Sequence, residues 1–193
     1  MGKILISVFL VFAISAQSGV IKNEALYLCE GYRDFFEIKN FSCQRELKSA
    51  SKFLIQKKDL NYSLIGAILD KDKDTTTKKE KQQIKKTIES ALLRYFSTPS
   101  YPKKIKEVEE AKGSSLFVFI RLSKYNDFTG IYYGDIEVVF DGAYPFIFKQ
   151  TRPLAFNRES QFSYLIESIN DTIKEIADEI FQMVNEDLEG KTK

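Results

Sequence analysis

The segment that decides the fold spans residues 61–96 and reads NYSLIGAILDKDKDTTTKKEKQQIKKTIESALLRYF. Its first nine residues are mostly apolar with little alternation, which is typical of a strand buried in a sheet. Thr77 and Glu80 match a capping box, in which a hydroxyl and a carboxylate accept hydrogen bonds from the free amides of a helix start. Apolar side chains then recur every three or four residues as far as Phe96. The segment therefore predicts a strand, a charged turn and a capped amphipathic helix.

Three further strands are predicted downstream, at residues 115–125, 131–140 and 143–152. Asp141-Gly142 is a strong hairpin signal between the last two of these strands. Pro145 lies in the third strand and cannot donate a ladder hydrogen bond, so we expect that strand at a sheet edge.

Helical spacing predicts three more helices, at residues 43–57, 102–113 and 160–188. Two helices with one apolar stripe each need a common surface, and a sheet supplies it. The predicted class is α+β: a two-layer α/β sandwich over 61–188, with a roughly four-stranded mixed sheet and two amphipathic helices on one face. Residues 19–60 form an N-terminal extension, and 189–193 a loose tail.

The first 18 residues have the pattern of a secretory signal peptide. Lys3 precedes an apolar run from Ile4 to Ile14, and small residues follow it. This run is shorter than the roughly 20 residues that span a membrane. We expect cleavage before Gly19, or alternatively after Ala16, and no membrane span in the mature chain. The predicted location is periplasmic or secreted.

The chain contains two cysteines, Cys29 and Cys43. An even number of cysteines in an exported chain favours one disulfide between them. A pair of buried free thiols is the alternative. The spacing excludes a Cys-x-x-Cys redox motif, and two cysteines supply too few ligands for a zinc site.

The composition excludes several kinds of chemistry. There is no histidine, which removes Ser-His and Cys-His catalysis and most transition-metal sites. The net charge is only +2, which together with export argues against nucleic-acid binding. No cofactor is predicted.

Three aspartates, Asp70, Asp72 and Asp74, follow the first strand and suggest two kinds of site. In a calcium loop, Thr75 would stand where a glycine is needed and Lys81 where a bidentate glutamate belongs. An Asp-x-Asp-x-Thr phosphotransfer nucleophile would need a parallel sheet that the pattern lacks. A solvated loop of paired charges is the favoured interpretation.

Aromatic residues gather in the predicted antiparallel strands and suggest a surface for a partner. Phe117 and Phe119 alternate with the core positions, and other rings follow them along the chain. The hypothesis assigns this surface to Phe117, Phe119, Tyr132, Tyr144 and Phe146. The alternative is that the N-terminal extension covers these rings with its own Phe35, Phe36 and Phe41.

Four segments give the chain a resemblance to a group of bacterial envelope domains. They are the strand and polar turn at 64–70, the Ile-x-x-x-Ile-x-x-Ala-Leu helix at 84–92, the small-residue lead into a strand at 110–118 and the Ile-Ala-Asp-x-Ile helix at 176–180. The layout is similar to the amino-terminal domain of TolB, to the penicillin-binding-protein activator LpoB and to auxiliary lipoproteins of ABC transporters. The chain departs from them in lacking their lipid-attachment cysteine and in carrying Gly-Ser-Ser before Leu116. The resemblance implies an envelope docking module and transfers no functional residue.

The sequence thus predicts a non-enzymatic envelope protein that binds a protein partner. One alternative is a small secreted metal-binding or phosphotransfer protein that uses Asp70, Asp72 and Asp74. Another is a structural subunit of a homo-oligomer.

Overall fold

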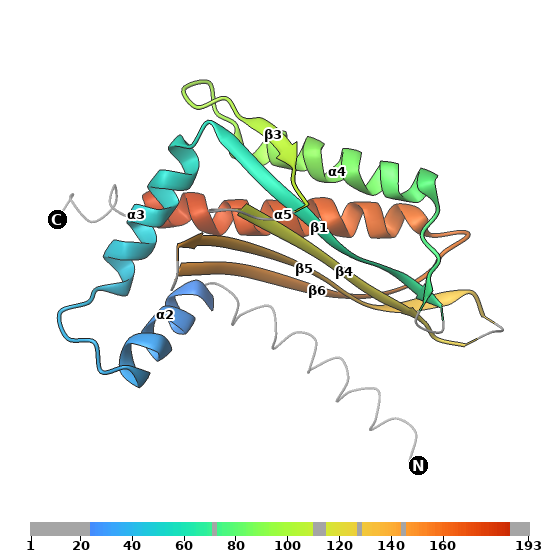
Figure 1. The fold of residues 1–193 in the computed structure, drawn as a ribbon, viewed down its shortest axis with the longest axis horizontal. Coiled ribbons are helices and arrows are strands. Elements are labelled where there is room, and N and C mark those ends of the chain that lie inside the picture. The colour runs from blue at the N-terminus through green and yellow to red at the C-terminus, as the bar shows by residue number, and fades with distance from the viewer. Residues whose placement is uncertain (1–23, 71–72, 110–114, 127–128, 144–145, 186–193) are drawn as a thin grey trace, which may run out of the picture.

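The computed structural model describes residues 24–70, 73–109, 115–126, 129–143 and 146–185 (Figure 1). The elements in chain order are α2 (Glu24–Phe35), α3 (Cys43–Gln56), β1 (Asp59–Asp70), β2 (Lys73–Asp74), α4 (Lys78–Phe96), β3 (Lys104–Glu107), β4 (Ser115–Lys124), β5 (Ile131–Ala143), β6 (Phe146–Asn157) and α5 (Phe162–Asn185). The α+β class is confirmed. The predicted signal peptide and C-terminal tail lie outside the described residues.

The described strands form one six-stranded mixed sheet. Its four long strands lie in the order β1-β4-β5-β6, with β1 and β4 parallel and the other neighbours antiparallel. Two short strands, β2 and β3, add to the outer side of β1 and bring the number above the predicted four. The third strand of the predicted meander is the edge strand β6, as expected, although Pro145 itself lies outside the described residues.

Helices α4 and α5 lie side by side on one face of the sheet (Figure 1). Side chains at even positions of the four long strands point toward these helices. In β4 these are Leu116, Val118, Ile120 and Leu122, each at most 2% exposed. The predicted capping box is confirmed, because the Thr77 hydroxyl accepts from the Glu80 amide and the Glu80 carboxylate accepts from the Thr77 amide. No helix within the described ranges is long and apolar enough to cross a membrane.

The N-terminal extension forms two helices at one end of the sandwich. Helix α3 packs against α5, and α2 contacts both α3 and β6 (Figure 1). The predicted disulfide is confirmed: Cys29 of α2 is bonded to Cys43 of α3, with their Cα atoms 5.8 Å apart.

The helix predicted at 102–113 is wrong, because Lys104–Glu107 forms strand β3 instead. The outer edge of β1 offers unpaired backbone groups, and a neighbouring segment that pairs with them is stabilised. The amide of Lys104 donates to the carbonyl of Lys58, and that of Val108 donates to Tyr62. This pairing outweighs the weak helical pattern.

The predicted hairpin turn is also misplaced. Asp141 and Gly142 belong to β5, and Ala143 pairs with Phe146, so the pairing of the hairpin closes three residues later than expected. A turn at 141–142 would shift the register by an odd number and rotate every side chain of β6 to the other face. The observed register instead places Phe148 and Phe156 in the core.

Two glycines flank β4 where the sheet backbones approach closely. Gly66 of β1 has a φ of 115°, and Gly134 of β5 has a φ of 152°. A Cβ atom on Gly134 would lie 1.8 Å from the carbonyl oxygen of Arg121. Only glycine fits this position without a shift of the β4 backbone.

We expect Gly134→Ala to lower the free energy of unfolding by about 2 kcal/mol, because alanine is strained at this φ and overlaps β4. Urea unfolding measures the change. Gly31→Ala is the matched control, since Gly31 lies in α2 with no heavy atom within 4 Å of its added Cβ. Alanine in a helix should be neutral or slightly stabilising. Equal stability of the two variants would contradict the proposed strain.

Candidate functional site

The sheet face opposite the helices carries exposed apolar side chains. We define the open face by Ile65 of β1, Phe117 and Phe119 of β4, and Tyr133 of β5. Ile65 is 42% exposed and Tyr133 is 51% exposed, while the two phenylalanine rings are half-buried. Ile65 lies directly beside Phe119 in the sheet. The rings of Phe117 and Phe119 stack with centroids 6.1 Å apart. Ile65, Phe117 and Phe119 form an apolar stripe across β1 and β4, while Tyr133 of β5 lies beyond it, opposite Ser123 and on the far side of the Arg121–Asp135 pair.

A network of ion pairs borders this stripe. Arg121 donates to Asp135 at 2.8 Å and to Glu137 at 3.1 Å, and Lys149 pairs with Glu137 at 2.8 Å. Burial alone would raise the pKa of Glu137, but the hydrogen bonds from Lys149 and Arg121 lower it below its ordinary value. The hydrogen bond to Asp135 raises the pKa of Arg121. These charges of the open face therefore compensate one another.

The five residues of the predicted partner surface do not all lie on the same face of the sheet. Phe117 and Phe119 lie on the open face, as expected from alternation along β4. Tyr132 does not, because its even position in β5 turns it toward the helices, where it is 6% exposed beneath the guanidinium of Arg158. Tyr144 and the side chain of Phe146 lie outside the described part of the chain.

The N-terminal phenylalanines are not the cover that the alternative hypothesis required. Phe35 is 80% exposed and Phe36 is 55% exposed, so neither packs on the sheet. Phe41 is half-buried against the core. Sequence reasoning missed Ile65 as a member of the open face, and it counted Tyr133 among the nearby rings without assigning it to the partner surface. The signal for both was their odd position beside strand residues whose even neighbours are buried.

The aspartates after β1 are held by different lysines. Asp70 pairs with Lys124 at 3.1 Å, and Asp74 pairs with Lys81 at 2.8 Å. The hydrogen bond from Lys81 lowers the pKa of Asp74 to about 2. Asp72 lies outside the described residues. In the described ranges, no three Cys, Asp or Glu side chains are grouped to hold a metal ion.

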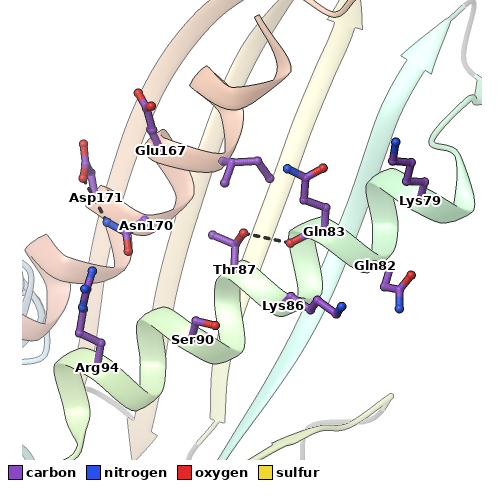
Figure 2. A pocket seen from close by; sticks show the side chains of 11 residues that line it. Lys79, Gln82, Gln83, Lys86, Thr87, Ser90, Arg94, Glu167, Asn170 and Asp171 are labelled. Atoms are coloured by element: carbon purple, nitrogen blue, oxygen red, sulfur yellow. Dashed lines mark hydrogen bonds between the residues drawn. The ribbon is translucent and has the colours of Figure 1, made fainter.

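A groove of about 570 Å³ runs between α4 and α5 on the side away from the sheet (Figure 2). Sequence reasoning did not find it. The two helices start close together, where Arg158 meets Glu80, and contact again where the Tyr95 hydroxyl bonds to the Asn170 side chain. The space between these contacts is lined almost entirely by polar side chains.

The two walls of the groove carry opposite charge. The α4 wall presents Lys79, Lys86 and Arg94, and the α5 wall presents Glu167 and Asp171 (Figure 2). Asp171 is paired with Arg152 of β6 at 3.2 Å. Ile166 of α5 adds an apolar side chain to the lining, and the remaining residues are uncharged donors and acceptors: Gln82, Gln83, Thr87, Ser90 and Asn170. This arrangement suits a polar ligand better than an apolar one.

Comparison with known proteins identifies no family for this chain. No family model matches it, and no curated protein sequence matches it significantly. Among solved structures, it is similar to a protein described as a "putative lipoprotein" from Caulobacter crescentus CB15. The match has a TM-score of 0.30 and 10% sequence identity, and it covers 77% of this chain and 98% of the other. At this TM-score the likeness carries no argument, and the resemblance to TolB-type domains stays a prediction.

Proposed function

We propose that this chain is an exported, non-enzymatic docking module of the bacterial cell envelope. It binds a protein partner by covering the open face with an apolar, uncharged patch of that partner. The observation that carries the proposal is the one-sided cover of the sheet: α4 and α5 bury one face, while Ile65 and Tyr133 remain exposed on the other.

The partner's chemistry is inferred from the charges beside the apolar stripe. An interface that buries an unpaired charge is penalised by desolvation, whereas a charge that is already paired needs no counter-charge from outside. Arg121, Asp135, Glu137 and Lys149 are paired with one another. A partner surface without charges can therefore cover the open face. Burial of apolar area contributes roughly 25 cal/mol per Å² before the costs of association.

The location rests on two supports. Residues 1–18 have the signal-peptide pattern, and Cys29 and Cys43 form a disulfide, which persists in oxidising compartments outside the cytosol. Both favour a periplasmic or secreted protein.

Site-specific photo-crosslinking tests this function. A photoreactive phenylalanine analogue is placed at Phe119 in one variant and at Phe53 in the control. Phe53 is 55% exposed on α3, a helix that packs against α5 and α2. We expect a discrete adduct with another envelope protein from the Phe119 position and none from Phe53. Adding Ile65→Thr and Tyr133→Thr should remove at least nine-tenths of the adduct, because both changes make exposed positions of the open face polar.

Three outcomes would contradict the proposal. Adducts of equal yield from both positions would indicate non-specific contact. An adduct with a second copy alone would indicate a homo-oligomer instead. Binding of the purified protein to lipid vesicles, lost in the Ile65→Thr/Tyr133→Thr variant, would assign the open face to a membrane.

A further inference from the structure

We propose that the groove between α4 and α5 is a second binding site, which takes an extended acidic peptide segment. This inference does not depend on the open face, because the groove lies on the opposite side of the sandwich. The basic wall of α4 pairs with carboxylates of the peptide, and the carboxamides of the groove pair with its backbone.

The first argument is that the basic side chains of the groove form no ion pair with the described residues. Elsewhere on α4, Lys81 pairs with Asp74 and Lys85 pairs with Glu107. Lys79, Lys86 and Arg94 have no carboxylate partner among the described residues, and all three are exposed. On α4, Lys81 and Lys85 are therefore neutralised within the fold, Lys78 is exposed outside the groove, and the other three cations line the groove.

The second argument is spacing. Lys79, Lys86 and Arg94 follow one another at intervals of seven and eight residues, or about 10 and 12 Å along the helix axis. A polyproline II segment repeats its side-chain direction every three residues with a rise of about 3.1 Å per residue, so carboxylates at every third position recur about 9 Å apart. An extended segment with this pattern can meet the three cations in turn.

The third argument is the mixture of donors and acceptors. A polyproline II backbone has no internal hydrogen bonds, so its amide and carbonyl groups need partners. Gln82 and Gln83 carry carboxamides, which both donate and accept, whereas the carboxamide of Asn170 is already bonded to Tyr95 and Asp171. A polyphosphate or an anionic membrane would bring only acceptors and would face the carboxylate of Glu167 on the opposite wall. A peptide supplies N–H donors to that wall, and the lining therefore favours a peptide.

Fluorescence anisotropy tests the site with a labelled peptide of four Glu-Ala-Pro repeats. We expect saturable binding that weakens with added salt, and no binding of the matched Gln-Ala-Pro peptide. The variant Lys79→Gln/Lys86→Gln/Arg94→Gln should bind the acidic peptide at least tenfold more weakly. The control Lys52→Gln/Lys104→Gln/Lys106→Gln removes the same three charges from exposed positions outside the groove, and its affinity should stay within twofold.

A second measurement uses the unaltered protein. Carbodiimide coupling of the acidic peptide should join its carboxylates to Lys79 and Lys86, as identified by mass spectrometry. The proposal fails if coupling maps to other lysines, or if the control variant loses as much affinity as the groove variant. It also fails if polyphosphate of equal charge, or anionic vesicles, bind as well as the peptide, or if the peptide does not bind at all.

Discussion

Replacing Arg158 with methionine is expected to lower the free energy of unfolding by about 3–4 kcal/mol, toward the lower end of the cost of leaving one partner of a buried ion pair alone, because this pair is partly buried. Arg158 donates through Nε and Nη2 to the two carboxylate oxygens of Glu80, at 2.8 and 2.7 Å. Their side chains are only 15% and 16% exposed. Glu80 would therefore keep a charge that water cannot fully solvate.

The same guanidinium joins four parts of the chain. It also donates to the hydroxyl and carbonyl of Thr75 and to the hydroxyl of Tyr132. These contacts connect the segment before α5 with the start of α4, the turn after β2, and β5. Methionine retains the apolar contact with the Tyr132 ring but none of these hydrogen bonds.

The Arg158–Glu80 ion pair also makes the free energy of unfolding depend on pH. The hydrogen bond from Arg158 lowers the pKa of Glu80 from 4.5 to about 2. A carboxyl group whose pKa is lower in the folded state stabilises the fold above its unfolded pKa, and this contribution is lost as the pH falls. The contribution is therefore complete above pH 4.5 and declines toward pH 2. By linkage it amounts to about 3 kcal/mol at pH 7, of which about 2 kcal/mol is lost at pH 3.

Urea unfolding at pH 7 and pH 3 checks both expectations. The difference between the native protein and Arg158→Met should be large at pH 7 and clearly smaller at pH 3. Arg45→Met is the control, because Arg45 pairs with Glu46 on the surface of α3 and its side chain is 72% exposed. We expect that change to cost no more than about 1 kcal/mol. A pH-independent difference for Arg158→Met would show that the ion pair does not carry the effect.

Removing the disulfide should have the next largest effect. The double variant Cys29→Ala/Cys43→Ala is expected to have a free energy of unfolding about 3 kcal/mol lower than that of the native protein. The reason is that the disulfide closes a loop with a sequence separation of 14 and restricts the unfolded chain. Both sulfur atoms lie in the core, so the variant also loses some packing between α2 and α3.

Thermal unfolding with and without reductant measures this contribution. Reductant should lower the melting temperature of the native protein toward that of the double variant, and it should leave the double variant unchanged. Limited proteolysis should cut first within α2, since the disulfide links that helix to α3. If the melting temperature of the native protein does not change when its disulfide has been fully reduced, this expectation is contradicted.

Much of the fold follows from local pattern. The capping box at Thr77 and Glu80 involves residues three apart, so the chain specifies it before any distant contact forms. The apolar stripes of α4 and α5 have the helical period, and the alternation of β4 has the period of a strand. Parity along β4 also assigned Phe117 and Phe119 to the face away from the helices.

Other features depend on partners far away in the sequence. Residues 104–107 form a strand because their backbone pairs with the edge of β1. Their own sequence pattern did not predict it. The turn near Asp141 was displaced because the core accepts only the register that buries Phe148 and Phe156. Tyr132 was assigned to the wrong surface although it shares its parity in β5 with Ile136 and Val138, which are buried beneath the helices.

The amino-acid sequence by itself determined helices α3, α4 and α5, the long strands, their two-layer class and the pairing of two cysteines, because periodicity and short-range hydrogen bonds act within a few residues. Tertiary structure alone decided the Arg158–Glu80 pair, the pairing of residues 104–107 with β1, and the groove between α4 and α5. Each of these depends on the distance between elements that only packing brings together, and no periodicity in the chain records that distance.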